Sequence, residues 1–424
     1  MLWLCIRLPQ LAREALAANT RAAMESTMER LAAWAYQWSS QVSYHLSDPP
    51  LLWLELGASH RLFGGYAALM TRLEAGLTQL GYQHACALAP SAHGAALLTQ
   101  LERQRCVYTR AQLRLRLEPL PLRLLELPSE ITDALHSAGL RSIGQLLRLP
   151  ATAIARRFGP QTSVYLRRLL GQQSDPRPSW QLPPTYHARC EFGCELRDTT
   201  AMLFPLQRLL LEFQGYLRGR DCAVQRFTLR LEHYRHPASE LIIGLSAPGR
   251  EAAQFLQLVR ERLHDLVLPA AVSGLALEAH EFTSPSVVQA DFFGSNAQQL
   301  QQLQLLLDRL RARLGTDHVQ GLQPEADYRP ERAWSFAPPA TTQHDHNGVA
   351  QDQQPARPCF LTTDLQRVAP PARLLSGPER IESGWWDRAD AARDYYIAEG
   401  QDGARLWVFR DLSNGGWYLQ GLWT

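Results

Sequence analysis

The stretch LLWLELGASHRLFGG, residues 51–65, combines an apolar run with a polar turn that ends in two glycines. An apolar run of this length, bounded by a turn, is typical of a strand buried in the middle of a sheet. Other strand-like runs occur at 2–8 and 84–91, and helical periodicity occurs at 25–40 and 65–82. The alternation over residues 1–100 therefore predicts a mixed α/β domain with helices packed on a sheet.

The composition is that of a globular chain without a marked charge excess. Its 424 residues are 46% hydrophobic and 20% charged, and the formal net charge is +2. A chain of this length should form about two to four domains. All 43 basic residues are arginine, because the sequence holds no lysine. Any surface for nucleic acid must therefore be a local patch.

The seven cysteines are scattered, and only Cys190 and Cys194 lie close together. Since no second pair completes a zinc-binding spacing, we expect reduced thiols, no metal and no cofactor. The sequence shows neither a secretory signal pattern nor an apolar run of about 18 residues. These features predict a cytoplasmic protein that does not enter a membrane.

Residues 101–180 predict a series of short helices. This segment is rich in arginine, with 13 Arg against six acidic residues. The stretch ALHSAGLRSIGQLLRLP (134–150) predicts a helix, a glycine turn and a second helix. Residues 156–171 show a similar helix–turn–helix pattern. A helix-hairpin-helix of this kind aims backbone N–H groups at a phosphate. The candidate DNA contacts are Gly139, Leu140, Arg141, Ser142, Gly144, Arg156 and Arg157. The alternative is a plain helical corner in which Gly139 only ends a helix.

Residues 181–284 predict a β-α-β-β-α-β domain, a two-layer sandwich whose sheet leaves one face open. VQRFTLRLEHY (224–234) alternates, with Phe227 and Leu229 on one face and Thr228 and Arg230 on the other. Arg230 is therefore a further candidate DNA contact on the open face.

The remainder of the chain divides into three predicted parts. Residues 285–337 hold the peptide QADFFG (289–294) and an amphipathic helix at 296–315. Residues 338–370 predict a flexible linker, because the stretch PPATTQHDHNGVAQDQQPARP (338–358) lacks apolar anchors. Residues 371–424 predict a small β-rich module with a hairpin turn at 415–416. Its tryptophans favour a core role over a partner-binding face, although both interpretations stay open.

The order of these parts resembles the Y-family lesion-bypass DNA polymerases, which have a palm, a helical thumb and a little finger. The resemblance is carried by LWLELGASHRLFGG (52–65) and by GLRSIGQLLRLPATAIARRFG (139–159). It implies an α+β multidomain fold with a palm over 1–100, a thumb over 101–180 and a little finger over 181–284. A small β-rich module would follow at the C-terminal end.

Family polymerases hold two Mg²⁺ ions with palm carboxylates, and the resemblance places the matching positions at Cys5, Arg7, Pro50 and Leu51. None of these side chains carries a carboxylate, and a guanidinium cannot ligate Mg²⁺. Asp48 and Glu55 are the nearest acids. About fifty residues of a fingers region are also missing after the first strand. The resemblance therefore implies a protein without polymerase activity, whereas a divergent active translesion polymerase is the alternative.

Within the family, the chain resembles the catalytically inactive ImuB branch. The resemblance is carried by LWLCIRLPQLA (2–12), LAAWAYQWSSQVS (31–43), DYRPERAW (327–334), LLSGPERIESGWWD (374–387), RDYY (393–396) and GARLWVFRD (403–411). It implies an adaptor of the damage-induced (SOS) mutasome in translesion synthesis and DNA repair. Such an adaptor links the sliding clamp, an error-prone replicative-type DNA polymerase and a RecA-like accessory protein on damaged or primer-template DNA. An inert relic is a further alternative.

QADFFG is the candidate clamp-binding peptide of the chain. Bacterial clamp ligands are extended peptides with a glutamine, a small or acidic spacer and two large apolar residues, which fill an apolar cleft. Gln289, Asp291, Phe292 and Phe293 match this pattern. The alternative is a hydrophobic staple, in which the phenylalanines pack on the helix that follows.

Overall fold

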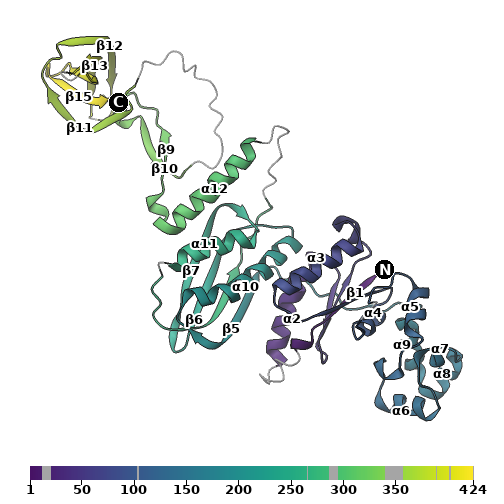
Figure 1. Ribbon diagram of the computed structural model, residues 1–424. Helices are drawn as coiled ribbons and strands as arrows, with labels where there is room; N and C mark the ends of the chain where they lie inside the picture. The colour runs from purple at the N-terminus through teal and green to yellow at the C-terminus, as the bar shows by residue number, and fades with distance from the viewer. Residues whose placement is uncertain are drawn as a thin grey trace. The chain divides into compact units, whose positions relative to one another are not determined.

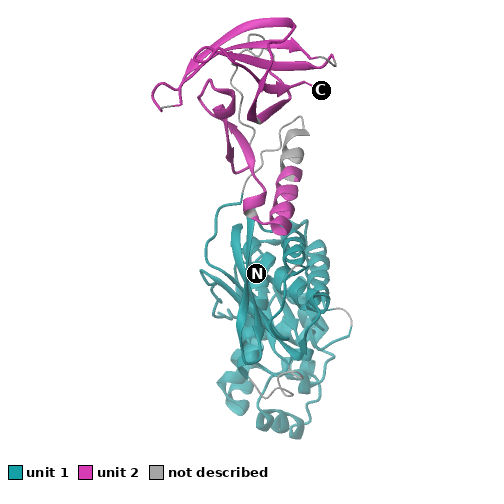
Figure 2. Cartoon of the chain, turned by 90° about the vertical axis from the view of Figure 1, so that its left-hand side faces the viewer, with its two compact units in different colours: residues 1–293 teal, residues 294–424 magenta. Residues whose placement is uncertain are grey.

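A computed structural model describes residues 1–11, 21–102, 105–264, 266–285, 295–339, 357–387, 389–400 and 403–423. The chain forms two compact units, residues 1–293 and residues 294–424, shown in different colours in Figure 2. Each unit is described by itself below. In the described part of the chain, no helix has the length and apolar character that a membrane crossing requires.

The first unit begins with a four-stranded antiparallel sheet. Its strands are β1 (Trp3–Arg7), β2 (Val42–His45), β3 (Leu51–Glu55) and β4 (Ala85–Ala89), in the order β2-β3-β1-β4. The helices are α2 (Arg21–Ala35), α3 (Tyr66–Gln79) and α4 (Ala92–Leu98), with a 3-10 turn η1 (His60–Phe63). The predicted mixed α/β domain is therefore present, and β2 is a strand that the sequence pattern did not reveal.

Both faces of this sheet are covered. Leu4 and Ile6 of β1 belong to a core formed with α2 and α3, whereas Cys5 belongs to a second core formed with α4 and the helices that follow. Figure 1 shows α2 and α3 beside β1, with α4 on the other side. A sheet buried on both faces explains the continuous apolar run of LLWLEL.

The arginine-rich segment folds as short helices. They are α5 (Arg110–Leu117), η2 (Leu122–Leu124), α6 (Ser129–Ser137), α7 (Ile143–Leu147), α8 (Ala151–Phe158) and α9 (Pro160–Leu169). Capping boxes fix the start of two of them, with Thr109 and Gln112 at α5 and Ser142 and Gln145 at α7. The predicted pair of helix–turn–helix segments is thus formed by α6–α7 and α8–α9.

The next domain has the predicted β-α-β-β-α-β order. Its elements are β5 (Tyr186–Leu196), α10 (Thr199–Gly219), β6 (Val224–His233), β7 (His236–Gly249), α11 (Ala252–His264) and β8 (Val272–Ala279), with sheet order β5-β8-β6-β7. Helices α10 and α11 lie side by side on one face of this sheet (Figure 1). Phe213 of α10, Phe227 of β6 and Phe255 of α11 meet in the core.

Helix α10 also packs directly against α2 of the first sheet. A Cβ on Gly215 would lie 2.9 Å from Cα of Trp34, so only a glycine allows the two helices to approach this closely. Glu212 is completely buried at this contact, where its carboxylate lies 3.0 Å from Nε of Arg30 and 3.5 Å from Nε of Arg208. The two sheet domains are therefore joined by a packed, ion-paired interface.

The second unit holds α12 (Ser295–Leu314), η3 (Thr316–His318), β9 (Gly321–Pro324), η4 (Pro330–Arg332) and β10 (Trp334–Ala337), with β9 and β10 paired as a ribbon. A five-stranded antiparallel sheet follows, formed by β11 (Phe360–Val368), β12 (Arg373–Ser383), β13 (Ala391–Glu399), β14 (Arg405–Asp411) and β15 (Trp417–Leu422). The turn at Gly415 and Gly416 joins β14 to β15, as predicted.

One predicted boundary in this unit is wrong. Strand β11 lies within the segment 338–370 that the sequence suggested as a linker, and it pairs with β15. The paired strand makes residues 360–368 part of the β-rich module, which therefore begins before residue 371. Apolar residues at Phe360 and Leu361 supply the strand character that the polar remainder of the segment concealed.

Candidate nucleic-acid interface and the degenerate palm site

The four positions that the family resemblance assigns to metal ligands lie close together on the first sheet. The register of β1 and β3 pairs Cys5 with Trp53 and Arg7 with Leu51. Cys5 is completely buried, and burial raises the pKa of its thiol far above the usual value. Arg7 donates from Nε to Oγ1 of Thr99 at 3.1 Å. Cys5, Pro50 and Leu51 are buried, Arg7 is half-buried, and none of the four side chains is acidic.

The nearest acidic residues, Glu55 and Asp48, do not replace the missing metal ligands. Glu55 accepts hydrogen bonds from the backbone N–H groups of Leu2 (3.1 Å) and Gly57 (2.9 Å), so its carboxylate fastens the ends of two strands. Asp48 is exposed in the loop before β3. Across the described ranges, no three His, Cys, Asp or Glu side chains gather in a way that could hold a metal ion.

The sheet face that carries Cys5 is closed by Trp53 and its neighbours. The indole N–H of Trp53 donates to the backbone oxygen of Ala92 at 3.0 Å. The guanidinium of Arg177 lies 3.9 Å from the centre of the Trp53 ring. The core behind them continues without interruption into the arginine-rich helices. A primer terminus and two hydrated metal ions would have to displace this core.

The first hairpin of the helical region uses its backbone donors internally. The N–H groups of residues 139–144 donate to the backbone oxygens of His136, Leu135, Leu120 and Glu118 and to the side chain of Gln145. A Cβ on Gly144 would lie 2.8 Å from the backbone oxygen of Glu118, so this glycine serves close packing. Phosphate contact through Gly139, Leu140, Ser142 or Gly144 stays a prediction, and it requires these hydrogen bonds to open.

Exposed arginines lie on the second hairpin. Arg156 and Arg157 end α8 and are both exposed. Arg157 stacks over the ring of Phe158 at 5.6 Å, and Arg156 has no ion-pair or hydrogen-bond partner among the described residues. In contrast, Arg141 of the first hairpin donates to the backbone oxygen of His136 at 2.8 Å. The second hairpin therefore offers guanidinium groups that are more available to a phosphate.

The open face of the β5–β8 sheet is less basic than the sequence suggested. Arg230 lies on this face as predicted, but its guanidinium is 3.2 Å from Glu240 and 3.4 Å from Glu278. Arg189 is ion-paired with Glu191 of its own strand and with Glu232 of β6. Cross-strand ion pairs thus occupy both arginines. A DNA contact by Arg230 stays a prediction, with weaker support than one by the α8 arginines.

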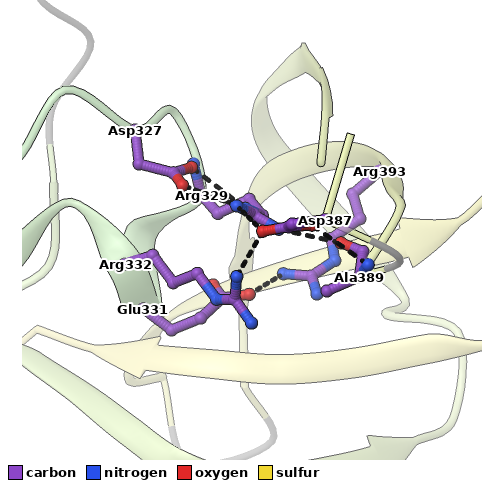
Figure 3. A network of polar contacts seen from close by, with 7 residues as sticks. All are labelled: Asp327, Arg329, Glu331, Arg332, Asp387, Ala389 and Arg393. Carbon is purple, nitrogen blue, oxygen red and sulfur yellow. Dashed lines mark hydrogen bonds and ion pairs between the residues drawn. The ribbon is translucent and has the colours of Figure 1, made fainter. Parts of the chain in front are cut away.

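In the second unit, three of the stretches that carry the ImuB resemblance meet in one network (Figure 3). Arg329 of DYRPERAW is only 3% exposed and binds Asp327 at 2.6 Å and Asp387 at 2.7 Å. The hydrogen bonds from Arg329 lower the pKa of Asp387 to about 2. Arg393 of RDYY lies 2.9 Å from Glu331. The network fastens the segment before β10 to the five-stranded sheet.

The tryptophans of this unit fall into two groups. Trp407 is buried and stacks on Tyr395, which agrees with the predicted core role. Trp385 and Trp386 are 79% and 58% exposed, beside the Arg329 network. The core interpretation is therefore wrong for this pair. Adjacent exposed aromatic side chains are typical of binding surfaces.

The predicted clamp-binding residues Gln289, Asp291, Phe292 and Phe293 lie outside the described residues. They follow the last strand of the β-α-β-β-α-β domain, and the described chain resumes at α12.

At the four positions that the resemblance assigns to metal ligands, the chain carries no carboxylate, and Cys5, Pro50 and Leu51 are buried. Over almost its whole length the chain is similar to Protein ImuB of Caulobacter vibrioides. The proteins of strains NA1000 / CB15N and ATCC 19089 / CIP 103742 / CB 15 are each 26% identical over 439 residues, which cover 95% of this chain and 94% of the relative. The resemblance to the ImuB branch is thereby confirmed.

No family model matches the chain. Among solved structures, DinB from Sulfolobus solfataricus aligns with 66% of this chain and 98% of its own, at 10% identity and a TM-score of 0.35. The insertion ternary complex of Dbh DNA polymerase aligns with the same shares, at 10% identity and a TM-score of 0.31. Because both scores are low, the description of the fold rests on the elements themselves.

Proposed function

We propose that the protein is a non-catalytic, DNA-binding adaptor in damage-induced mutagenesis and translesion synthesis. The observation that carries this proposal is the lack of a carboxylate at Cys5, Arg7, Pro50 and Leu51. Cys5 is also buried in a core that it shares with Trp53 and α4. Two-metal nucleotidyl transfer requires carboxylates at such a site. The alternative, an active but divergent translesion polymerase, has no comparable support.

The adaptor holds DNA through backbone charge rather than base recognition. The helical region supplies exposed guanidinium groups without supplying a groove-reading helix, and arginine suits bidentate phosphate contacts. Among the candidate contacts named from the sequence, Arg156 and Arg157 are the residues most available for this role. Binding of this kind depends steeply on salt and little on base sequence.

The remaining partners attach outside the DNA-binding region. The peptide at 289–293 binds the sliding clamp, and the second unit recruits an error-prone replicative-type polymerase and a RecA-like accessory protein. The exposed pair Trp385 and Trp386 supports a partner-binding role for the second unit. The adaptor acts in the cytoplasm, with no cofactor and no membrane contact.

Two variants that remove arginines from different surfaces test the DNA contact. Replacing Arg156 and Arg157 with glutamine should weaken binding to primer-template DNA by a similar factor for every sequence. It should also lower the slope of log affinity against log salt by about 2, roughly one for each lost phosphate contact. Arg230→Gln should change the slope much less, because Glu240 and Glu278 already pair with Arg230. Fluorescence anisotropy across a salt series measures both quantities.

A larger effect of Arg230→Gln than of the double variant would place the DNA on the open sheet face instead. Undetectable binding of the unmodified chain at low salt would remove DNA binding from the proposal.

A further inference from the structure

A pocket of about 790 Å³ lies at the edge of the first sheet, where the connector 171–179 leaves α9. The connector is fastened to this edge, because the backbone N–H of Trp180 donates to the oxygen of Val42 in strand β2 at 2.7 Å. The connector, the sheet edge and the helical region all contribute walls, and we call this space the connector pocket. Its volume lies in the range of small-molecule sites, about 300–1,000 Å³.

The charge of the connector pocket is positive. Arg110, Arg168 and Arg177 line it, and Asp175 is the only acidic residue among its walls. Asp175 is already paired with Arg177 at 3.2 Å. Among the described residues, the guanidinium groups of Arg110 and Arg168 have no ion-pair partner. Two unneutralised arginines on one concave wall favour an anion.

Several buried polar atoms in the pocket lack a hydrogen-bond partner. They are Nε of Arg168 and Nε of Arg177, which are donors, and Oε1 of Gln173, which is an acceptor. Oδ2 of Asp175 also lacks a hydrogen bond, although it is ion-paired with Arg177. A buried polar group without a partner is unfavourable, so these atoms favour a ligand that satisfies them. Phosphate oxygens accept from the arginines, whereas a sugar hydroxyl or a base N–H group donates to Gln173. A nucleotide carries both kinds of group.

Aromatic surfaces complete the site. Trp3 and Tyr108 line the same pocket, and Tyr108 is 48% exposed. A base can stack on such rings without regard to its identity. From the charge, the unpaired donors and acceptor and the aromatic walls, we infer that the connector pocket binds a nucleoside phosphomonoester. The source is a free nucleotide or the 5′-terminal phosphate of a DNA strand.

The test compares ligands that differ only in the phosphate. A short single strand with a 5′-phosphate should bind the full-length chain about tenfold more tightly than its 5′-hydroxyl twin, the effect of about one charge-assisted hydrogen bond. Deoxyadenosine monophosphate should displace the 5′-phosphorylated strand better than deoxyadenosine or inorganic phosphate does. The comparison of twin strands does not depend on the overall DNA affinity, so it can fail while the adaptor proposal stands.

Variants locate the effect. Arg110→Gln with Arg168→Gln should abolish the preference for the phosphorylated ligand and leave the melting temperature unchanged, since neither side chain has an ion-pair partner to lose in the part of the chain that the structure describes. Arg260→Gln with Arg262→Gln removes the same charge from exposed positions of α11 and should keep the preference.

Direct binding of the nucleotide, without discrimination between the strands, would identify a free nucleotide as the ligand and support the inference. Equal competition by inorganic phosphate and nucleotide would overturn it, because the aromatic walls would then contribute nothing. Absence of any phosphate preference, or its persistence in the Arg110 and Arg168 variant, would also overturn it.

Discussion

Replacing Glu212 with alanine is expected to lower the free energy of unfolding by about 3–5 kcal/mol, the usual effect of removing one partner from a buried ion pair. Glu212 is completely buried between α2 and α10, and its carboxylate lies between Arg30 and Arg208. Burial opposes the charge of Arg30, but Glu212 raises the pKa of its guanidinium above the usual value. Without the carboxylate, the two partly buried positive charges of Arg30 and Arg208 would lie close together with no negative charge between them.

The same chain provides a matched control for this prediction. Glu251→Ala removes an exposed carboxylate that lies 2.8 Å from Arg218, and exposed pairs contribute about 1 kcal/mol or less. Urea denaturation of the full-length variants measures both changes. Equal losses for Glu212→Ala and Glu251→Ala would contradict the ion-paired interface between the two sheet domains.

Replacing both Phe292 and Phe293 with alanine is expected to weaken clamp binding about a thousandfold or more. In the proposed complex each ring fills a desolvated part of the clamp cleft, where large aromatic side chains contribute most of the binding energy. Gln289→Ala should cost less, because its hydrogen bonds at the rim exchange with water. Surface plasmon resonance on immobilised clamp measures the affinities.

Two exposed phenylalanines of the second unit serve as the control for the clamp prediction. Phe336→Ala with Phe360→Ala removes the same side chains from exposed strands and should leave clamp affinity unchanged. If Phe292 and Phe293 instead staple α12, their replacement would lower the melting temperature and preserve clamp binding. That combination of results would contradict the proposal that the peptide at 289–293 binds the clamp.

Periodicity predicted the elements that bury a regular apolar face. The run at 2–8 forms β1, and the alternation around Phe227 forms β6 within the expected β-α-β-β-α-β order. Both patterns are local, because alternating side chains enter opposite faces of a sheet. Short or polar strands left no such signal, which is why β2 and β11 were not anticipated.

The candidate sites depended on contacts that no local pattern contains. Arg329 and Asp387 are 58 positions apart, so only the fold shows that DYRPERAW and GWWD form one network. The alternation around Arg230 predicted its face correctly, but the pairing with Glu240 and Glu278 comes from neighbouring strands. Similarly, the loss of carboxylates at Cys5 and Arg7 is visible in the sequence, whereas the closing of that face by Trp53 and Arg177 is not.

The central claim is tested most directly by primer extension on DNA that the protein saturates, with Mg²⁺ or Mn²⁺ and all four deoxynucleotides. We expect no incorporation by the unmodified chain, because residues 5, 7, 50 and 51 provide no metal ligand. Cys5→Asp with Arg7→Asp should not restore activity, since Pro50 and Leu51 still offer no carboxylate and the sheet face stays covered. Template-directed incorporation by the unmodified protein would contradict the account.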